Sequence, residues 1–174
     1  MQKGLWRMIE VLRLSHRIPR DSRMTTHVAL TSRAFGATKM YYSGQHDKEM
    51  VQSVMDVVKN FGGDFDVEYV KDAIKLINEK KKNGFKIIHL TMYGIGFEEK
   101  KIKNDKVLVI VGGEKVEGEI YKLADYNISV GSQPHSEVGA LSVFLYKNFG
   151  IRQDFENSKI KIIPSEKGKN VKEI

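Results

Sequence analysis

The chain of 174 residues contains no cysteine, only three prolines and a single tryptophan. Without cysteine it has no disulfide bond, no thiolate nucleophile and no cysteine-ligated zinc or iron–sulfur centre. No apolar run approaches the roughly 20 residues that a membrane-spanning helix requires. The segment MQKGLWRMIEVLRLSHR also lacks the pattern of a secretory signal. These absences predict a cytoplasmic protein with no membrane partner.

The composition is that of an ordinary globular domain. Hydrophobic residues make up 41% of the chain and charged residues 29%, and a chain of this length buries a substantial core. No internal repeat and no linker of biased composition divides the sequence. We therefore expect one domain over residues 1–174.

The charge balance is basic, with a formal net charge of +7 and an isoelectric point near 9.4. An excess of lysine and arginine favours a polyanionic partner such as nucleic acid. A lysine-rich surface also serves solubility alone, so charge by itself leaves both interpretations open. The lysine-rich segments 72–84 and 159–174 are predicted to be solvated surfaces, with diffuse RNA affinity as the alternative.

Short apolar stretches alternate with segments of helical periodicity. KVLVIV, inside residues 105–113, is apolar throughout, which is typical of a strand buried on both faces. The alternation predicts an open, mostly parallel α/β sheet with helices on both faces. The predicted strands are 9–14, 38–42, 66–70, 85–90, 105–113 and 125–131, and the predicted helices are 26–36, 47–63, 72–84, 117–124 and 136–148.

Three late strands end in segments that resemble ligand-binding loops: HLTMYGIG (89–96), VGGEKV (111–116) and VGSQPHSEV (130–138). Open α/β sheets bind ligands beyond the carboxyl ends of their strands, and glycines there let a backbone approach a ligand closely. The spacing of a P-loop is missing, and no GxGxxG follows the first strand. The segments therefore predict a pocket for something other than an ordinary dinucleotide.

The polar cluster in 130–137 allows three interpretations. Ser132, His135 and Glu137 lie too close in sequence to form a hydrolase triad readily, and the five histidines are too scattered for a metal site. Capping explains more, because Ser136 or His135 can begin the helix that follows. We expect a loop that caps this helix and presents its backbone to a ligand.

The N-terminal stretch RLSHRIPRDSRMTTH is rich in arginine. It is either a solvated loop or an edge that holds RNA phosphates through guanidinium groups. Thr25 and Thr26 are the expected N-caps of the next helix, and Arg33 inside that helix is expected to be an exposed charge. Tyr93 has two possible roles, stacking on a base or ligand ring and packing in the protein, and packing is the expected one.

Three stretches together resemble one family closely: LRLSHRIPRDSRMTTHVALTSRAFGA (12–37), HLTMYG with VGGEKV, and VGSQPHSEVGALSVFL (130–145). They resemble the archaeal tRNA ribose methyltransferases that modify cytidine 56, a branch of the SPOUT superfamily. The likeness covers most of residues 8–171 and is weak in 44–85 and in 97–104.

The resemblance implies an enzyme that uses S-adenosylmethionine to methylate a ribose 2′-hydroxyl in the tRNA T-loop and that works as a homodimer. It also implies that the C-terminal part of the sheet forms a trefoil knot, which nothing in the residue spacing shows. By the same likeness, three loops hold the cofactor. Their residues are Leu90, then Gly112, Gly113, Glu114, Lys115 and Val116, then Val130, Gly131, Ser132, Gln133, Pro134, His135, Ser136 and Glu137.

Methyl transfer from a sulfonium to a ribose oxygen needs no metal, but it needs alignment and removal of the hydroxyl proton. Superfamily relatives use an arginine of the N-terminal motif, which makes Arg23 the first candidate here and Arg20 the second. Because arginine stays protonated, its role is better described as orienting phosphate and hydroxyl. The alternatives are methylation of another RNA ribose and a catalytically silent RNA-binding protein of the same fold. Helix 136–148 is the expected dimer interface, with core packing as the alternative.

Overall fold

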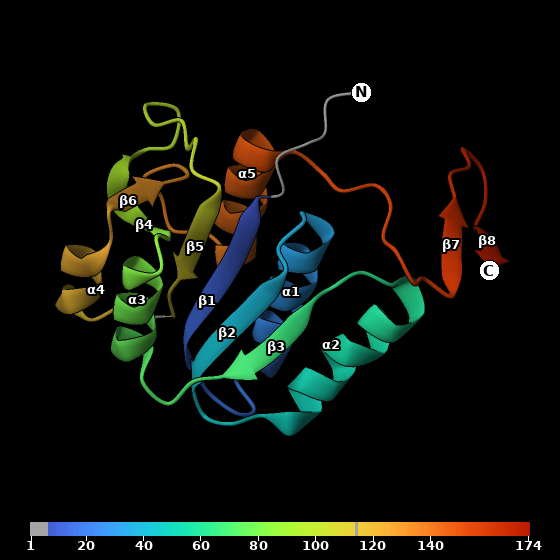
Figure 1. Cartoon of the computed structure of the whole chain (residues 1–174), viewed down its shortest axis with the longest axis horizontal. Helices are drawn as coiled ribbons and strands as arrows, with labels where there is room; N and C mark the ends of the chain where they lie inside the picture. Colours follow the sequence, from blue (N-terminus) through green and yellow to red (C-terminus); the bar gives the residue numbers. More distant parts are fainter. Residues whose placement is uncertain (1–6, 114) are drawn as a thin grey trace.

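Six parallel strands form the main sheet, in the order β3-β2-β1-β5-β4-β6 (Figure 1). The structure is a computed structural model that describes residues 7–113 and 115–174. The strands are β1 Met8–His16, β2 Lys39–Gly44, β3 Asp66–Tyr69, β4 Lys86–Gly96, β5 Lys106–Val111 and β6 Tyr126–Ser129. The prediction of an open parallel α/β sheet is confirmed.

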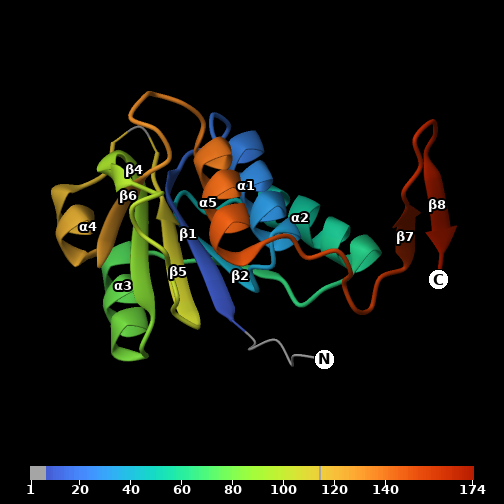
Figure 2. The same ribbon diagram turned by 90° about the horizontal axis from the view of Figure 1, so that it is seen from above.

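Helices cover both faces of this sheet (Figure 2). Val107 and Val109 of β5 face one hydrophobic core, while Leu108 and Ile110 face the other. All four side chains are fully buried, as the unbroken apolar run predicts. The first core is closed by α1 Ser22–Ala34, α2 Lys48–Phe61 and α5 Glu137–Phe149, and the second by α3 Ala73–Lys82 and α4 Gly118–Leu123.

The observed bounds differ most from the prediction at the start of α1 and at the end of β4. Helix α1 begins at Ser22, four residues before the expected start, with Asp21 at the N-cap position. The prediction that Thr25 or Thr26 caps it is therefore wrong. Strand β4 continues to Gly96 instead of ending at Leu90, so the first ligand-binding segment belongs to a strand.

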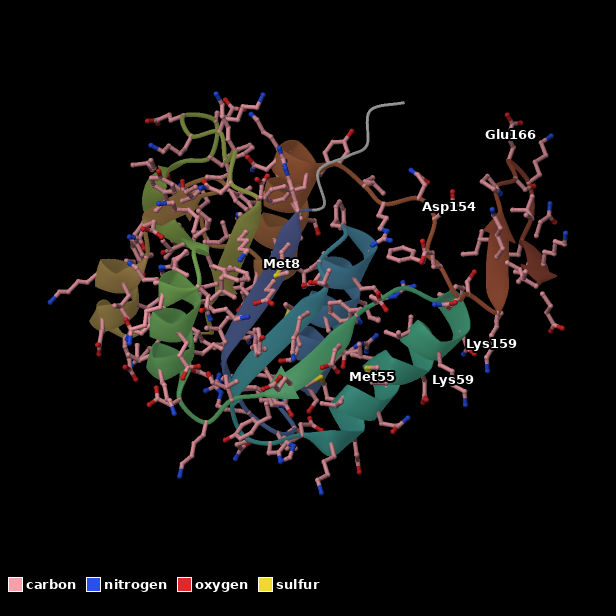
Figure 3. All side chains as sticks on the ribbon, viewed as in Figure 1. Met8, Met55, Lys59, Asp154, Lys159 and Glu166 are labelled. Carbon is pink, nitrogen blue, oxygen red and sulfur yellow. The ribbon has the colours of Figure 1, made fainter. Side chains whose placement is uncertain are left out.

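The C-terminal segment forms an antiparallel hairpin, β7 Ile160–Ile163 and β8 Asn170–Glu173, which projects beyond α2 (Figures 1 and 3). The sequence predicted only a solvated lysine surface here. Its residues are indeed largely exposed, but the base is fixed to the body. The amide of Lys159 donates to the carbonyl of Asn60 (2.9 Å), and the amide of Gly63 donates to the carbonyl of Glu156 (2.8 Å).

Arg33 is buried, so the expectation of an exposed charge is wrong. Its Nε donates to the carbonyl of Gly62 (3.1 Å), and Nη2 donates to the carbonyls of Phe61 (2.8 Å) and Gly62 (2.5 Å). These carbonyls end α2 and have no partner within that helix. The guanidinium also lies 4.2 Å from the ring centroid of Phe155. One side chain thus joins α1, the end of α2 and the segment that leads to the hairpin.

Arg33→Ala should lower the free energy of unfolding by about 2–4 kcal/mol, because it leaves the carbonyls at the end of α2 without donors and removes the contact with Phe155. Urea denaturation followed by circular dichroism measures this, with an unchanged m value expected. Arg152→Ala is the matched control, since Arg152 lies over the same ring at 5.1 Å and should contribute about 1 kcal/mol or less. Equal losses in the two variants would contradict a role for the hydrogen bonds to α2.

Candidate functional site

The carboxyl ends of β4, β5 and β6 surround a cavity of about 580 Å³. Small-molecule sites typically measure about 300–1,000 Å³, and this edge is where open α/β sheets bind ligands. The walls come from a first segment (89–93), a second loop (112–116) and a third loop (130–137). Of the predicted cofactor residues, Ser132 does not line the cavity and Glu114 lies outside the described residues. The remaining members of that set line it.

The second loop contains two glycines, each close to a neighbouring side chain. A Cβ at Gly112 would lie 2.3 Å from Cγ2 of Val116, and one at Gly113 would lie 3.3 Å from Nη1 of Arg13. A larger residue at Gly112 would therefore displace the loop. These close approaches explain why the sequence places two glycines after β5.

The third loop is held by its own polar side chains. His135 Nε2 donates to the carbonyl of Val130 (2.6 Å), which ties the two ends of the loop together. Oγ of Ser136 accepts from the amide of Val138 (3.2 Å) and caps α5. The prediction that this cluster shapes a loop and starts a helix is confirmed.

The first segment bulges out of β4. Its register with β6 jumps, because both Leu90 and Ile95 pair with Ile128. A Cβ at Gly94 would lie 2.5 Å from backbone atoms of Asn127 and Ile128, so only glycine fits this crossing. Tyr93, in the bulge, is 75% exposed at the cavity. The expectation that this ring packs inside the protein is therefore wrong.

His89 forms part of the cavity wall and was not predicted as a site residue. It is buried, and its Nδ1 donates to Oδ1 of Asn127 (2.8 Å). Burial lowers the pKa of His89, against the hydrogen bond with Asn127, and so favours the neutral ring. Its ring meets that of Tyr121 edge-on at 4.7 Å. Strand periodicity places His89 on the α4 side of the sheet, but no motif links it to Tyr121.

Arg13 lies behind the second and third loops and is 1% exposed. Its Nη1 donates to the carbonyl of Leu14 (2.6 Å), and Nη2 lies 3.9 Å from Oε1 of Glu137 at the start of α5. Burial lowers the pKa of Arg13, while Glu137 and Asp21 oppose that shift. This guanidinium lies beside Gly113 of the second loop and pairs with Glu137 of the third loop.

The residues 17–23, here named the arginine loop, run into α1. Arg20 and Arg23 are both exposed and neither lines the cavity. Their neighbour Met24 nevertheless places its sulfur 3.9 Å from Oγ of Ser136, so the start of α1 lies against the third loop. The assignment of a catalytic role to Arg23 or Arg20 stays a prediction.

A buried polar network anchors the arginine loop. The ring nitrogens of His16 lie 2.8 Å from Oγ1 of Thr25 and 3.1 Å from Oδ2 of Asp47. Oγ of Ser22 donates to the same carboxylate (2.6 Å). Burial opposes ionisation of Asp47, but hydrogen bonds from Ser22, the amide of Met50 and His16 lower its pKa below the ordinary value. Thr25 therefore serves this network rather than a helix cap.

A second hollow of about 560 Å³ adjoins the cavity. It is lined by Ser15, His16, Arg17, Gly44, Gln45 and Lys115, and Lys115 also lines the first cavity. Ser15 has a φ of 58°, a left-handed conformation that is uncommon outside glycine. The two hollows together form one site. The first has glycines in its wall, and the second is lined by the basic side chains of Arg17 and Lys115.

In the described parts of the chain, 7–113 and 115–174, no group of histidine, aspartate and glutamate side chains is arranged to hold a metal ion. Over the same residues, none of the helices has both the length and the apolar character needed to cross a bilayer.

Two solved structures show the same fold. A TrmH/SpoU tRNA modifying enzyme of A. aeolicus aligns with a TM-score of 0.63 and 18% identity, over 83% of this chain and 76% of its own. The SpoU methyltransferase AviRb of Streptomyces viridochromogenes, solved with the cofactor AdoMet, aligns with a TM-score of 0.64 and 14% identity, over 82% and 57%. At these identities the likeness establishes the fold, which is that of the SPOUT enzymes.

Sequence comparison is more specific. Residues 61–172 match the family described as tRNA ribose 2′-O-methyltransferase, aTrm56. The tRNA (cytidine(56)-2′-O)-methyltransferase of Archaeoglobus fulgidus is 54% identical, covering 94% of this chain and 97% of its own length. The enzyme of the same name from Methanobrevibacter smithii is 49% identical, covering 94% of each chain. The chain therefore belongs to the aTrm56 family of tRNA ribose 2′-O-methyltransferases.

Proposed function

We propose that the protein transfers the methyl group of S-adenosylmethionine to the ribose 2′-hydroxyl of cytidine 56 in the tRNA T-loop. One observation carries the proposal. The three segments that the family likeness names as cofactor loops meet around a single cavity at the carboxyl edge of the sheet. The family relatives cover nearly the whole chain and carry the name of this reaction.

The residues of the cavity fit the cofactor, which combines an apolar purine ring with polar and charged groups. Leu90, Val116, Val130 and Ala140 supply apolar surface for a ring. The second loop contributes Gly112 and Gly113, which have no side chains to cover the backbone, and backbone groups supply the hydrogen bonds that recognise a purine edge. When bound, S-adenosylmethionine supplies an electrophilic methyl group for in-line displacement by the ribose oxygen.

The chain's own task is alignment. Arg13 pairs with Glu137 of the third loop and lies beside Gly113 of the second, and the network of His16 holds the arginine loop beside them. Holding two reactants in a fixed relative orientation lowers the entropic part of the activation barrier. Arg23, with Arg20 as the second candidate, orients the phosphate and the 2′-hydroxyl of the acceptor nucleotide. The hydroxyl loses its proton to solvent or to a nearby base.

We also propose that two copies of the chain form a homodimer, with α5 at the interface. Gly139, Val143 and Tyr146 share one stripe of α5, and the last two are 43% and 60% exposed. Phe144, by contrast, is fully buried in the protomer's own core, so it is not available to a second copy. Exposed apolar side chains aligned on one helix face favour a symmetric contact between two copies.

Three further features complete the proposal. Residues 1–174 act as one domain in the cytoplasm, where the absence of cysteine suits a reducing environment. The segment after β6 threads into the trefoil knot of the SPOUT fold. Membership of the aTrm56 family supports this part of the proposal.

Incubation of the purified protein with methyl-labelled S-adenosylmethionine and an unmodified tRNA transcript should place label in 2′-O-methylcytidine. Changing cytidine 56 in the transcript should abolish the transfer, because the target nucleotide is lost. Nucleoside analysis by mass spectrometry locates the label. Label in another ribose would favour the alternative enzyme, and cofactor or RNA binding without any transfer would favour a silent RNA-binding protein.

Arg23→Ala should lower kcat/KM for tRNA by about 10- to 100-fold or more, because one charge-assisted contact to phosphate is lost. The Kd for S-adenosylmethionine, measured by calorimetry, should stay unchanged. Lys59→Ala, an exposed cation in the last turn of α2, is the matched control and should behave as wild type. Unaltered turnover in Arg23→Ala with a loss in Arg20→Ala would assign the role to Arg20.

A further inference from the structure

Tyr93 stands out among the exposed side chains of the site. It is 75% exposed, and its neighbours Met92 and Ile95 are 37% and 48% exposed. An aromatic ring normally buries a large apolar area in a core or interface. Here the ring lies open to solvent at the cavity formed by the cofactor loops. Within residues 7–113 and 115–174, no aromatic or cationic side chain stacks on it.

The local backbone holds this ring outward. The bulge in β4 interrupts the pairing with β6 between Leu90 and Ile95, and bulges near active sites commonly redirect a side chain. On one side of Tyr93, Gly94 is pressed against the backbone of β6. On the other side, Oγ1 of Thr91 lies 3.2 Å from the hydroxyl of Tyr121 on α4. The exposed position is therefore built into the fold from both ends.

Building on the proposed function, we propose that Tyr93 is the stacking platform for the base of the acceptor nucleotide. A nucleotide of the folded tRNA elbow must leave its stack before its ribose can reach the cofactor, and the released base then lacks a partner for its flat faces. An exposed tyrosine with apolar neighbours at the cavity supplies that partner. The arginine loop and Lys115 provide positive charge for the flanking phosphates.

Stacking on an aromatic side chain contributes about 1–3 kcal/mol per base, which corresponds to roughly 5- to 150-fold in affinity. Tyr93→Ala should therefore raise KM for tRNA about 10- to 100-fold and leave the Kd for S-adenosylmethionine unchanged. Tyr93→Phe keeps the ring and should restore KM. Ile162→Ala, which truncates a 61% exposed side chain on the C-terminal hairpin, is the matched control for loss of exposed apolar surface.

A transcript with an abasic ribonucleotide at position 56 tests the contact directly. It should impair the wild-type protein as much as Tyr93→Ala does, and it should cause no further loss in that variant. Independent losses would overturn the proposal. So would a raised Kd for S-adenosylmethionine in Tyr93→Ala, because the ring would then stack on the cofactor's adenine.

The two proposals fail in distinguishable ways. If the wild-type protein transfers no methyl group, the proposed enzymatic function is lost, and the Kd for tRNA measured by fluorescence anisotropy replaces KM. Tyr93→Ala should still weaken that Kd, with Tyr93→Phe as the control. If the wild type is active and Tyr93→Ala has an unchanged KM, the stacking role alone is overturned.

Discussion

At Gly94 the backbone of β4 approaches the parallel strand β6 more closely than a Cβ atom would allow. The residues before Gly94 bulge out of the pairing with β6, and there they form one wall of the cavity and expose Tyr93. β6 then leads directly into the third loop and the capped start of α5. The close pairing of β4 with β6 therefore brings the first and third segments of the site together.

The sequence predicted the sheet and the three segments well, because both depend on local patterns. The apolar run of β5 needs a sheet buried on two faces, and glycines after β5 and β6 indicate loops near a ligand. The sequence failed where a partner lies far along the chain. The partners of Arg33 are 28 and 29 residues away, and those of His89 are on β6 and α4. Helical or strand periodicity predicts which face of an element a side chain occupies, but not which residues it contacts.

For buried polar groups too, the sequence alone does not show which side chains find partners in the interior. Arg13 and His16 belong to a basic stretch that suggests a surface loop, yet they are 1% and 0% exposed. Both meet acidic or polar partners in the interior, although the buried Nε of Arg13 has no hydrogen-bond partner among the described residues. The stretch therefore separates into inward residues that contact the site from behind and outward residues such as Arg23. In the sequence, the inward and outward residues belong to one continuous motif.

The pairing of β1 with β5 has a consequence for how the two substrates are brought together. Groups expected to face RNA come from the end of β1 and the arginine loop, whereas one cofactor wall begins at the end of β5. Arg13 pairs with Val111 directly across the two strands, so the RNA half and the cofactor half share one ladder of hydrogen bonds. A slip of one residue would turn every side chain of β1 to the opposite face. The register of β1 against β5 therefore fixes the position of Arg13 and the arginine loop relative to the second loop.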